Sequence, residues 1–302
     1  MPATYASHRH AGLIMAITAY TIWGVMPLYL LLVRWVPAYE FIAWRVICTI
    51  PVCLFFLLTL RQFAALGSAV RNRRVLALLA LSALLVAINW TIYVAAVQSG
   101  QVLAASLGYY INPLANVFAG TLFLGERLTR GQWIAVALAA LGVSLLAWDA
   151  REMLWISLSL AVTFCAYGLV RKLAPVESLP GLTIETLILL VPALLTVWWY
   201  AQGPQGIAMG RDAGSSALLA FSGAMTGIPL LLFAAAARRM DYSTLGMTQF
   251  FAPTIVFVLG VTVFGEPLRP SQLACFVMIW CAIAVFVWDI LMRSRSAQQA
   301  PA

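Results

Sequence analysis

Apolar residues dominate this chain in long runs that are separated by charged residues, prolines and glycines. The runs occupy residues 11–34, 39–60, 75–98, 102–123, 132–149, 153–172, 181–200, 216–237, 243–264 and 271–291. Each run is close to the roughly 20 residues that an α-helix needs to cross the hydrocarbon core of a bilayer. The pattern therefore predicts an all-α integral membrane protein with ten transmembrane helices. The first run exceeds the roughly 7 to 15 apolar residues of a signal peptide, so we expect it to remain as the first span.

Composition excludes a soluble domain. Of the 302 residues, 63% are hydrophobic and only 9% are charged, whereas soluble proteins carry about 25% charged residues because their surfaces face water. Ten spans with short links also use up the whole chain, so we expect the lipid bilayer to be its main surroundings and no large domain outside it.

The basic residues indicate orientation rather than nucleic-acid binding. The net charge is +8, but the cations are scattered singly or in small groups. With a cytoplasmic N-terminus, thirteen cations fall on the inside and four (Arg34, Arg151, Arg211 and Arg269) on the outside. Because cytoplasmic loops carry the excess of Lys and Arg, this bias predicts that both termini are cytoplasmic.

An internal repeat divides the chain into two halves. A shift of 140 positions gives eight identities between residues 113–149 and 253–289, among them Pro113 with Pro253, Gly125-Glu126 with Gly265-Glu266, and Trp148-Asp149 with Trp288-Asp289. We therefore expect a first repeat over 1–149 and a second over 150–302. Each half holds five helices, an odd number, so the second half enters the membrane from the opposite side. Inverted repeats of this kind are typical of transporters.

Local signals support the links between helices. Gly125 follows an apolar run as a helix-terminating glycine does, and Thr129-x-x-Gln132 has the spacing of a capping box. Pro270 suits the first position of a helix. We expect Glu126 and Glu266 to have structural roles at these links. Gly223-x-x-x-Gly227 predicts a close approach of two helix backbones.

Two ionisable residues stand out because a charge inside a membrane is costly and therefore a functional candidate. Arg45 lies near the outer end of the second run, and Glu185 lies near the inner end of the seventh. A guanidinium can grip a substrate carboxylate, and a carboxylate can hold an ammonium group or carry a coupling proton. The structural alternatives are that Arg45 reaches outward or pairs with Glu40, and that Glu185 acts as a cap or pairs with Arg171 or Lys172.

Polar and aromatic residues within the apolar runs suggest the wall of a cavity. We expect a binding site for a small-molecule substrate formed by Trp23, Arg45, Asn89, Trp90, Tyr93, Tyr110, Asn112, Glu185 and Gln249. Gly24, Pro113, Gly168 and Pro253 are the expected bending points, since proline removes a backbone hydrogen bond one turn back. The alternative is that these residues only join helices to one another.

No motif of a soluble enzyme is present. The sequence lacks GxSxG, a P-loop and HExxH, so we expect no catalytic residues and transport driven by a gradient rather than by nucleotide hydrolysis. The five cysteines lie in apolar runs without metal-binding spacing, and His8 and His10 stand together without further ligands. We therefore expect the cysteines to pack, and no metal ion or cofactor.

The chain resembles the drug/metabolite transporter superfamily with two EamA-type halves, and within it the RarD permeases. The resemblance lies in Ile22-Trp23-Gly24, Arg45-Val46, Asn89-Trp90, the run from Ala105 to Leu114, Gly125-Glu126-Arg127, Tyr167-Gly168, Ile184-Glu185-Thr186-Leu187, Ser243–Gly246 and Pro253. It implies an inner-membrane protein with ten helices around a central cavity. Trp44 departs from the pattern, because some relatives have histidine before the arginine.

The repeat, the buried charges and the resemblance together predict a secondary transporter that exports small metabolites or amino-acid-like or drug-like compounds by alternating access. A lipid or polyprenol-linked substrate flippase is the alternative, because the same duplicated helices can support it. The sequence leaves the substrate, the direction, the coupling ion and the oligomeric state open.

Overall fold

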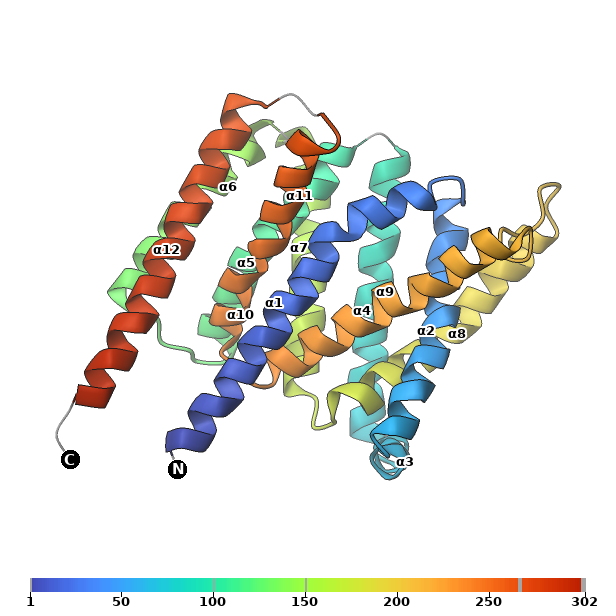
Figure 1. Ribbon diagram of the computed structural model, residues 1–302, viewed down its shortest axis with the longest axis horizontal. Coiled ribbons are helices and arrows are strands. Elements are labelled where there is room, and N and C mark those ends of the chain that lie inside the picture. Colours follow the sequence, from blue (N-terminus) through green and yellow to red (C-terminus); the bar gives the residue numbers. More distant parts are fainter. Residues whose placement is uncertain (1, 100, 150, 266–267, 300–302) are drawn as a thin grey trace.

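The computed structural model describes residues 2–99, 101–149, 151–265 and 268–299 as helices joined by short links (Figure 1). The described residues contain no β-strand. In chain order the helices are α1 (Pro2–Leu32), α2 (Ala38–Thr59), α3 (Phe63–Arg71), α4 (Arg73–Gln98), α5 (Val102–Phe123), α6 (Arg130–Asp149), α7 (Leu154–Leu173), α8 (Ser178–Ala201), α9 (Ala213–Ala237), α10 (Tyr242–Gln249), α11 (Phe251–Thr262) and α12 (Pro270–Gln299), with a short 3₁₀ turn at Arg151–Met153.

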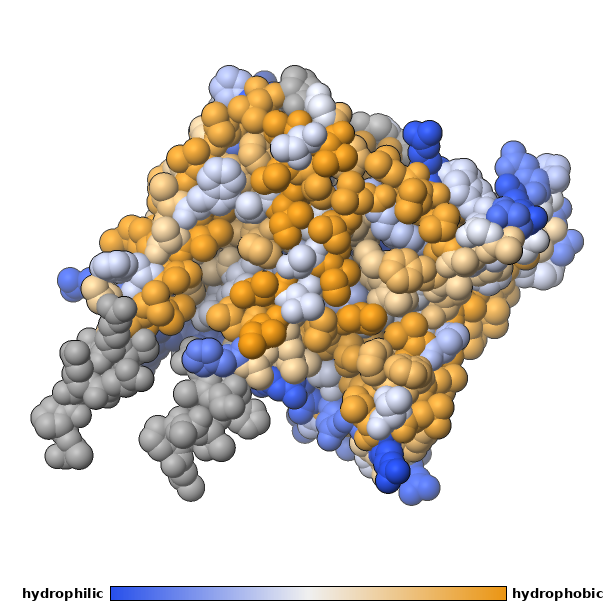
Figure 2. All heavy atoms as spheres, in the orientation of Figure 1, coloured by the Kyte–Doolittle hydropathy of each residue, from blue (hydrophilic) through white to orange (hydrophobic). Residues whose placement is uncertain are grey.

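Nine segments of the described residues are long and apolar enough to cross a membrane, with α10 and α11 together forming one of them. α5 is also long, at 22 residues, but it carries several polar residues and is not among the nine. Figure 2 shows hydrophobic residues covering most of the visible face, with hydrophilic residues gathered toward its edges. The prediction of an all-α integral membrane protein is confirmed, and the count of ten spans stays a prediction.

Helix caps explain where the observed boundaries differ from the predicted ones. α4 begins at Arg73, because the Asn72 side chain accepts hydrogen bonds from the backbone N–H groups of Arg74 and Val75 at 3.0 and 3.2 Å. α9 begins at Ala213, because Asp212 accepts from the Ser215 N–H at 2.8 Å. Hydropathy alone places these starts two or three residues too late, since capping residues are polar.

Two further differences concern whole segments. The short helix α3 lies between α2 and α4 and was not predicted, because nine residues are too few for a span. The predicted run 243–264 is interrupted at Phe250, where α10 ends and α11 begins. Pro253 accounts for the break, since its ring displaces the carbonyl one turn earlier.

The predicted link signals are confirmed. Gln132 N–H donates to Thr129 Oγ1, and Thr129 N–H donates to Gln132 Oε1, both at 3.0 Å, which is the reciprocal pattern of a capping box. Gly125 has a φ of +66°, a conformation that favours glycine at a helix end. α12 begins at Pro270, as predicted.

Glu126 has a structural role, but on a distant helix rather than on its own link. Its carboxylate accepts from the backbone N–H groups of Tyr242 and Ser243 at 2.6 and 2.8 Å, and so caps the start of α10. A negative charge at a helix N-terminus is favourable because the N–H groups there have no partner within the helix. Glu266, its counterpart in the repeat, lies outside the described residues.

The close approach predicted for the two glycines of α9 occurs against α2. A Cβ atom on Gly223 would overlap the carbonyl oxygen of Cys48, and one on Gly227 would lie 3.0 Å from Thr49 Cγ2. Cys53, Cys165 and Cys275 are buried, as expected of packing residues, whereas Cys281 is exposed. The largest core cluster gathers side chains from α1, α2, α4, α5, α7, α8, α9 and α10.

Candidate functional site

A cavity of about 440 Å³ lies between the helices. This volume falls within the range of roughly 300 to 1,000 Å³ that is usual for small-molecule sites. Its lining extends from the link between α1 and α2, at Val33, Arg34 and Val36, to Tyr20 and Trp23 in the middle of α1. The described lining includes no residue of the α7–α8 or α9–α10 links, which lie toward the other end of the helices. The cavity therefore extends toward one end of the bundle.

Arg45 is one of two cations that line this cavity, the other being Arg34. Its Nε donates to Thr226 Oγ1 at 2.8 Å, which joins α2 to α9. The centre of the guanidinium lies 5.0 Å from the ring centre of Trp90 and 5.6 Å from that of Phe41. Both rings are close enough for a cation–π interaction, which offsets part of the cost of holding a charge away from bulk water. The guanidinium is thus held at its Nε edge and flanked by aromatic rings.

Glu40 is not the partner of Arg45, contrary to one of the alternatives considered above. Glu40 is fully buried, and its Oε1 accepts from Trp44 Nε1 at 3.1 Å and from the backbone N–H of Ala208 at 2.5 Å. The carboxylate therefore ties α2 to the link between α8 and α9. The indole N–H of Trp44 thus orients this carboxylate.

Amide side chains connect the cavity wall to neighbouring helices. Asn89 Nδ2 donates to the Leu160 carbonyl and to Thr163 Oγ1, both at 2.9 Å, and so joins α4 to α7. Gln249 Oε1 accepts from Asn116 Nδ2 at 2.7 Å, which joins α10 to α5. These bonds satisfy amide groups that would otherwise be costly to bury. They also fix Asn89 and Gln249 where both line the cavity.

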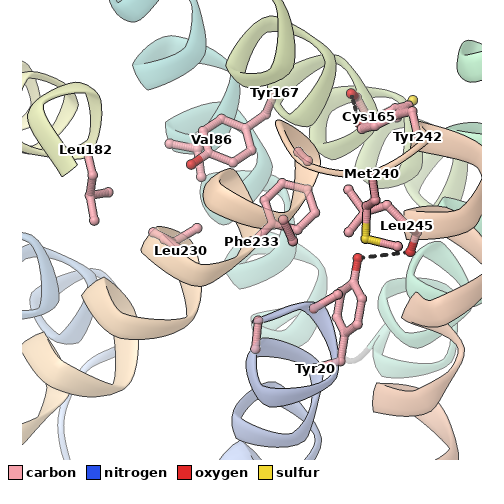
Figure 3. Packing of buried hydrophobic residues seen from close by; sticks show 14 of the residues in the cluster. Tyr20, Val86, Cys165, Tyr167, Leu182, Leu230, Phe233, Met240, Tyr242 and Leu245 are labelled. Carbon is pink, nitrogen blue, oxygen red and sulfur yellow. Dashed lines mark hydrogen bonds between the residues drawn. The ribbon is translucent and has the colours of Figure 1, made fainter. Parts of the chain in front are cut away.

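Aromatic side chains close the inner end of the cavity, which is the end farthest from the link between α1 and α2. Tyr20, Trp23, Phe164, Tyr167 and Phe233 form what we call the aromatic plug, with Phe164 and Phe233 centred 5.4 Å apart and Trp23 5.8 Å from each of them. Figure 3 shows Tyr20, Phe233 and Tyr167 among the buried side chains of this region.

Hydrogen bonds brace the protein beyond the plug. Tyr20 OH donates to the Leu245 carbonyl at 3.2 Å, and Tyr242 OH donates to the Cys165 carbonyl at 2.7 Å (Figure 3). Lys172 Nζ donates to the carbonyls of Ala237 and Met240 at 2.8 and 2.7 Å, which ties α7 to the end of α9 and to the link that follows it. This end of the bundle is therefore closed by both apolar packing and polar contacts.

Glu185 lies in a buried ion pair outside the cavity lining. Its Oε1 is 3.5 Å from Arg171 Nη1, and the two side chains are only 4% and 1% exposed. Ser82 Oγ donates to the same carboxylate, and Arg171 Nη2 donates to the Ser178 carbonyl at 2.8 Å. Of the alternatives considered for Glu185, the geometry matches pairing with Arg171. Lys172 is engaged by backbone carbonyls instead.

The cavity brings together most of the residues expected to bind substrate. Those that line it are Trp23, Arg45, Asn89, Trp90, Tyr93, Tyr110 and Gln249, together with Pro253. Asn112 lies outside the lining, since its Nδ2 donates to the Ala161 carbonyl at 2.9 Å. Gly24, Pro113 and Gly168 also lie outside it. Gly24 and Gly168 are closely packed, because a Cβ would lie 2.8 Å from Ile255 Cβ in the first case and 2.8 Å from Phe233 Cζ in the second.

Several residues of the site were not predicted, and three of them bear on its charge and on the position of Arg45. Arg34 and Phe41 line the cavity toward its mouth, and Thr226 holds Arg45. Arg34 was assigned only to the orientation signal, because it lies at the end of an apolar run. Thr226 lies between Gly223 and Gly227, the two close-packed glycines of α9. A polar residue between these glycines is the one feature of the sequence that could have indicated a role for it.

Comparison with known proteins identifies the family. The sequence model of the EamA-like transporter family matches residues 10–148. Protein RarD of Salmonella typhimurium is 41% identical over 291 residues, which cover 96% of this chain and 99% of that protein. The chain belongs to the EamA-like transporter family and is a RarD-type member of the drug/metabolite transporter superfamily.

Further comparisons agree with this RarD-type assignment. An uncharacterized transporter of Pseudomonas aeruginosa is 44% identical over 288 residues, covering 95% of this chain and 97% of that protein. A solved structure described only as a crystal structure of a protein superimposes with a TM-score of 0.70 at 17% identity, covering 92% of this chain and 97% of the other. The last comparison shows the fold alone. The RarD-type chain is a multi-pass membrane protein of a transporter family.

Proposed function

We propose that this RarD-type protein is a secondary transporter of the bacterial inner membrane that exports small organic solutes by alternating access. The observation that carries the proposal is the cavity of about 440 Å³, which extends toward one end of the bundle and contains Arg45. A site at mid-membrane that reaches only one face is the arrangement that alternating access requires.

The packing of the helices supports two exchangeable halves. Exchange of residues 1–149 with 150–302 pairs α1 with α7, α2 with α8, α4 with α9, α5 with α10–α11, and α6 with α12. The observed contacts follow this exchange. The contact of α1 with α9 has its counterpart in the contact of α7 with α4, and the contact of α1 with α10 and α11 has its counterpart in the contact of α7 with α5. Gly125 and Gly265, aligned by the repeat, share φ values of +66° and +64°. Rocking of one half against the other would then move the opening from one face to the other.

The contacts that would break and reform lie at the plug and beyond it. In the state described, Tyr20, Tyr242 and Lys172 bind carbonyls on neighbouring helices, and Arg171 pairs with Glu185. The cation bias of the sequence puts this closed end at the cytoplasmic face and the α1–α2 link at the outer face. The described state is then outward-facing. Export would require the plug to open and admit the solute from the cytoplasm.

Comparison of metabolites inside and outside cells tests the proposal. Cells that lack, express or overexpress the protein are profiled without a preselected substrate, and an Arg45→Ala variant of equal abundance and folding is the control. We expect at least one solute to be enriched outside only when the wild-type protein is present. Altered membrane lipids with unchanged soluble metabolites would contradict the proposal and favour a flippase.

A further inference from the structure

We infer that the substrate of the cavity is an organic anion with an apolar body and no ammonium group, bound through Arg45. This substrate class rests on the proposed transport function and narrows it. The class follows from three properties of the cavity: the sign of its charges, the way in which Arg45 is held, and the side chains that make up the remainder of the lining.

The charges of the cavity are of one sign. Arg45 and Arg34 line it, and none of the described lining residues is an aspartate or a glutamate. The two nearest carboxylates along α2 and α8 are engaged elsewhere, Glu40 by Trp44 and the Ala208 N–H, and Glu185 by Arg171 and Ser82. Among the described residues, Arg45 thus has no anionic partner. A bound anion would supply the missing counter-charge.

The hydrogen bonding of Arg45 leaves its outer edge available to such an anion. Its Nε is used by Thr226, and the described residues provide no hydrogen-bond acceptor for Nη1 or Nη2. A guanidinium presents a planar fork of donors that matches a carboxylate, sulfonate or phosphate oxygen pair. The Nε bond fixes the plane of the fork, so the protein holds the donor in place before the ligand arrives.

An ammonium group would be poorly placed in the same cavity. It would lie near two cations with no carboxylate from the described lining to balance it. Aromatic faces can replace a carboxylate for ammonium ligands, but those of Trp90 and Phe41 already face the guanidinium of Arg45. The cavity therefore favours a simple anion over a zwitterion such as an amino acid.

The rest of the lining suits an apolar body. Tyr93 and Tyr109 meet edge to face at 5.7 Å, and Trp23, Phe164 and Leu230 lie at the inner end. Aromatic and aliphatic side chains bury a ring or a short hydrocarbon chain favourably, because apolar surface leaves water on both partners.

Four ligands built on one skeleton test this class. The full-length protein in lipid nanodiscs is titrated with 3-phenylpropionate, its neutral amide, phenylalanine and 3-phenylpropylamine, with quenching of tryptophan fluorescence as the readout of binding. We expect 3-phenylpropionate to bind about 10- to 100-fold more tightly than the other three, the ratio expected for a charge-assisted hydrogen-bonded pair.

Variants tie the selectivity to Arg45. Arg45→Ala should abolish the preference for the anion over the amide, and Arg45→Lys should keep only part of it, because a lysine lacks the planar fork. Thr226→Val leaves the charge in place and should weaken anion binding several-fold, so it serves as a second test if Arg45→Ala does not fold. Arg151→Ala removes an exposed cation that lies over Trp148 and should change nothing.

Two outcomes would overturn the inference. Binding of phenylalanine or the amine as tight as that of 3-phenylpropionate would exclude the anionic class while leaving the transport function intact. Absence of binding by all four ligands to folded wild-type protein would exclude apolar-bodied anions of this size. Failure of the transport function itself would instead appear as unchanged metabolite profiles, which this titration does not measure.

Discussion

At the scale of single residues, charge placement separates binding from structure. Arg45 and Glu185 are both ionisable residues inside apolar helices, and the sequence suggested function for each. Their surroundings differ: Arg45 lines a cavity beside aromatic rings, whereas Glu185 is buried with Arg171 and Ser82. The partner of Arg45, Thr226, lies 181 positions away along the chain. The partners of Glu185 are Arg171, 14 positions away, and Ser82, 103 positions away, and both lie on other helices. Residue type and depth in the membrane therefore make both residues candidates for substrate binding, and only the fold distinguishes the cavity residue from the buried ion pair.

The Glu185 pair makes a prediction about stability. Glu185→Gln leaves Arg171 buried and without a counter-charge, and the loss of one partner of a buried pair costs about 3 to 5 kcal/mol. We expect a clear drop in the thermal unfolding midpoint of the purified protein. Glu152→Gln, at an exposed site, should leave the midpoint nearly unchanged.

A double variant separates the charge effect from a packing effect. In Arg171→Met with Glu185→Leu, neither charge remains, so the protein should be more stable than Glu185→Gln alone. The destabilisation of the double variant is compared with the sum of those of Arg171→Met and Glu185→Leu alone. If the two are equal, the uncompensated charge is not the cause of the instability, and this account of the pair is wrong.

At the scale of helices, capping and packing decide what hydropathy cannot. The apolar runs place nearly every long helix, because a span must be apolar whatever its neighbours. They miss α3, which is too short for a span, and they misplace the start of α4, which depends on the Asn72 cap. They also miss the break at Phe250, which depends on proline geometry. The repeat pointed to Pro113 and Pro253 as equivalent, yet α5 continues through Pro113 whereas α10 ends at Gln249, four residues before Pro253.

Glu126 provides a test of capping across helices. Its carboxylate receives two backbone N–H groups at the start of α10, so Glu126→Gln, which lacks the charge and can accept through only one oxygen, should destabilise the protein by about 1 to 2 kcal/mol. The measurement is the free energy of unfolding or, if unfolding is irreversible, the shift of the thermal midpoint.

Glu177 is the matched control for this substitution. It stands at the N-cap position of α8 and is exposed, but its side chain makes no capping hydrogen bond. Glu177→Gln should therefore have a much smaller effect than Glu126→Gln. Equal effects of the two substitutions would show that the contact between Glu126 and α10 contributes nothing specific.

At the scale of the whole molecule, the cavity and the plug are arranged end to end. Of the nine binding residues that the sequence predicted, seven line the cavity, because polar and aromatic residues within apolar runs need a partner or a cavity. It missed Arg34 and Thr226, whose roles depend on which helices become neighbours. The asymmetry between a lined mouth and a closed inner end is likewise a property of tertiary packing alone.

Accessibility of the cavity from each side of the membrane tests the central claim of alternating access most directly. The five native cysteines are replaced, and Ala252→Cys is introduced at a position that lines the cavity on α11. Right-side-out and inside-out vesicles are then treated with a membrane-impermeant maleimide. Ala139→Cys, in the fully buried core between α6 and α12, is the unreactive control.

We expect the thiol introduced by Ala252→Cys to be labelled from the face that carries the α1–α2 link in the state described here, and from the opposite face as the plug opens during turnover. Labelling from both faces, with the Ala139→Cys control unreactive, would support a cavity that alternates between the two sides. Labelling from one face alone under every condition, gradients of transported solutes included, would contradict alternating access.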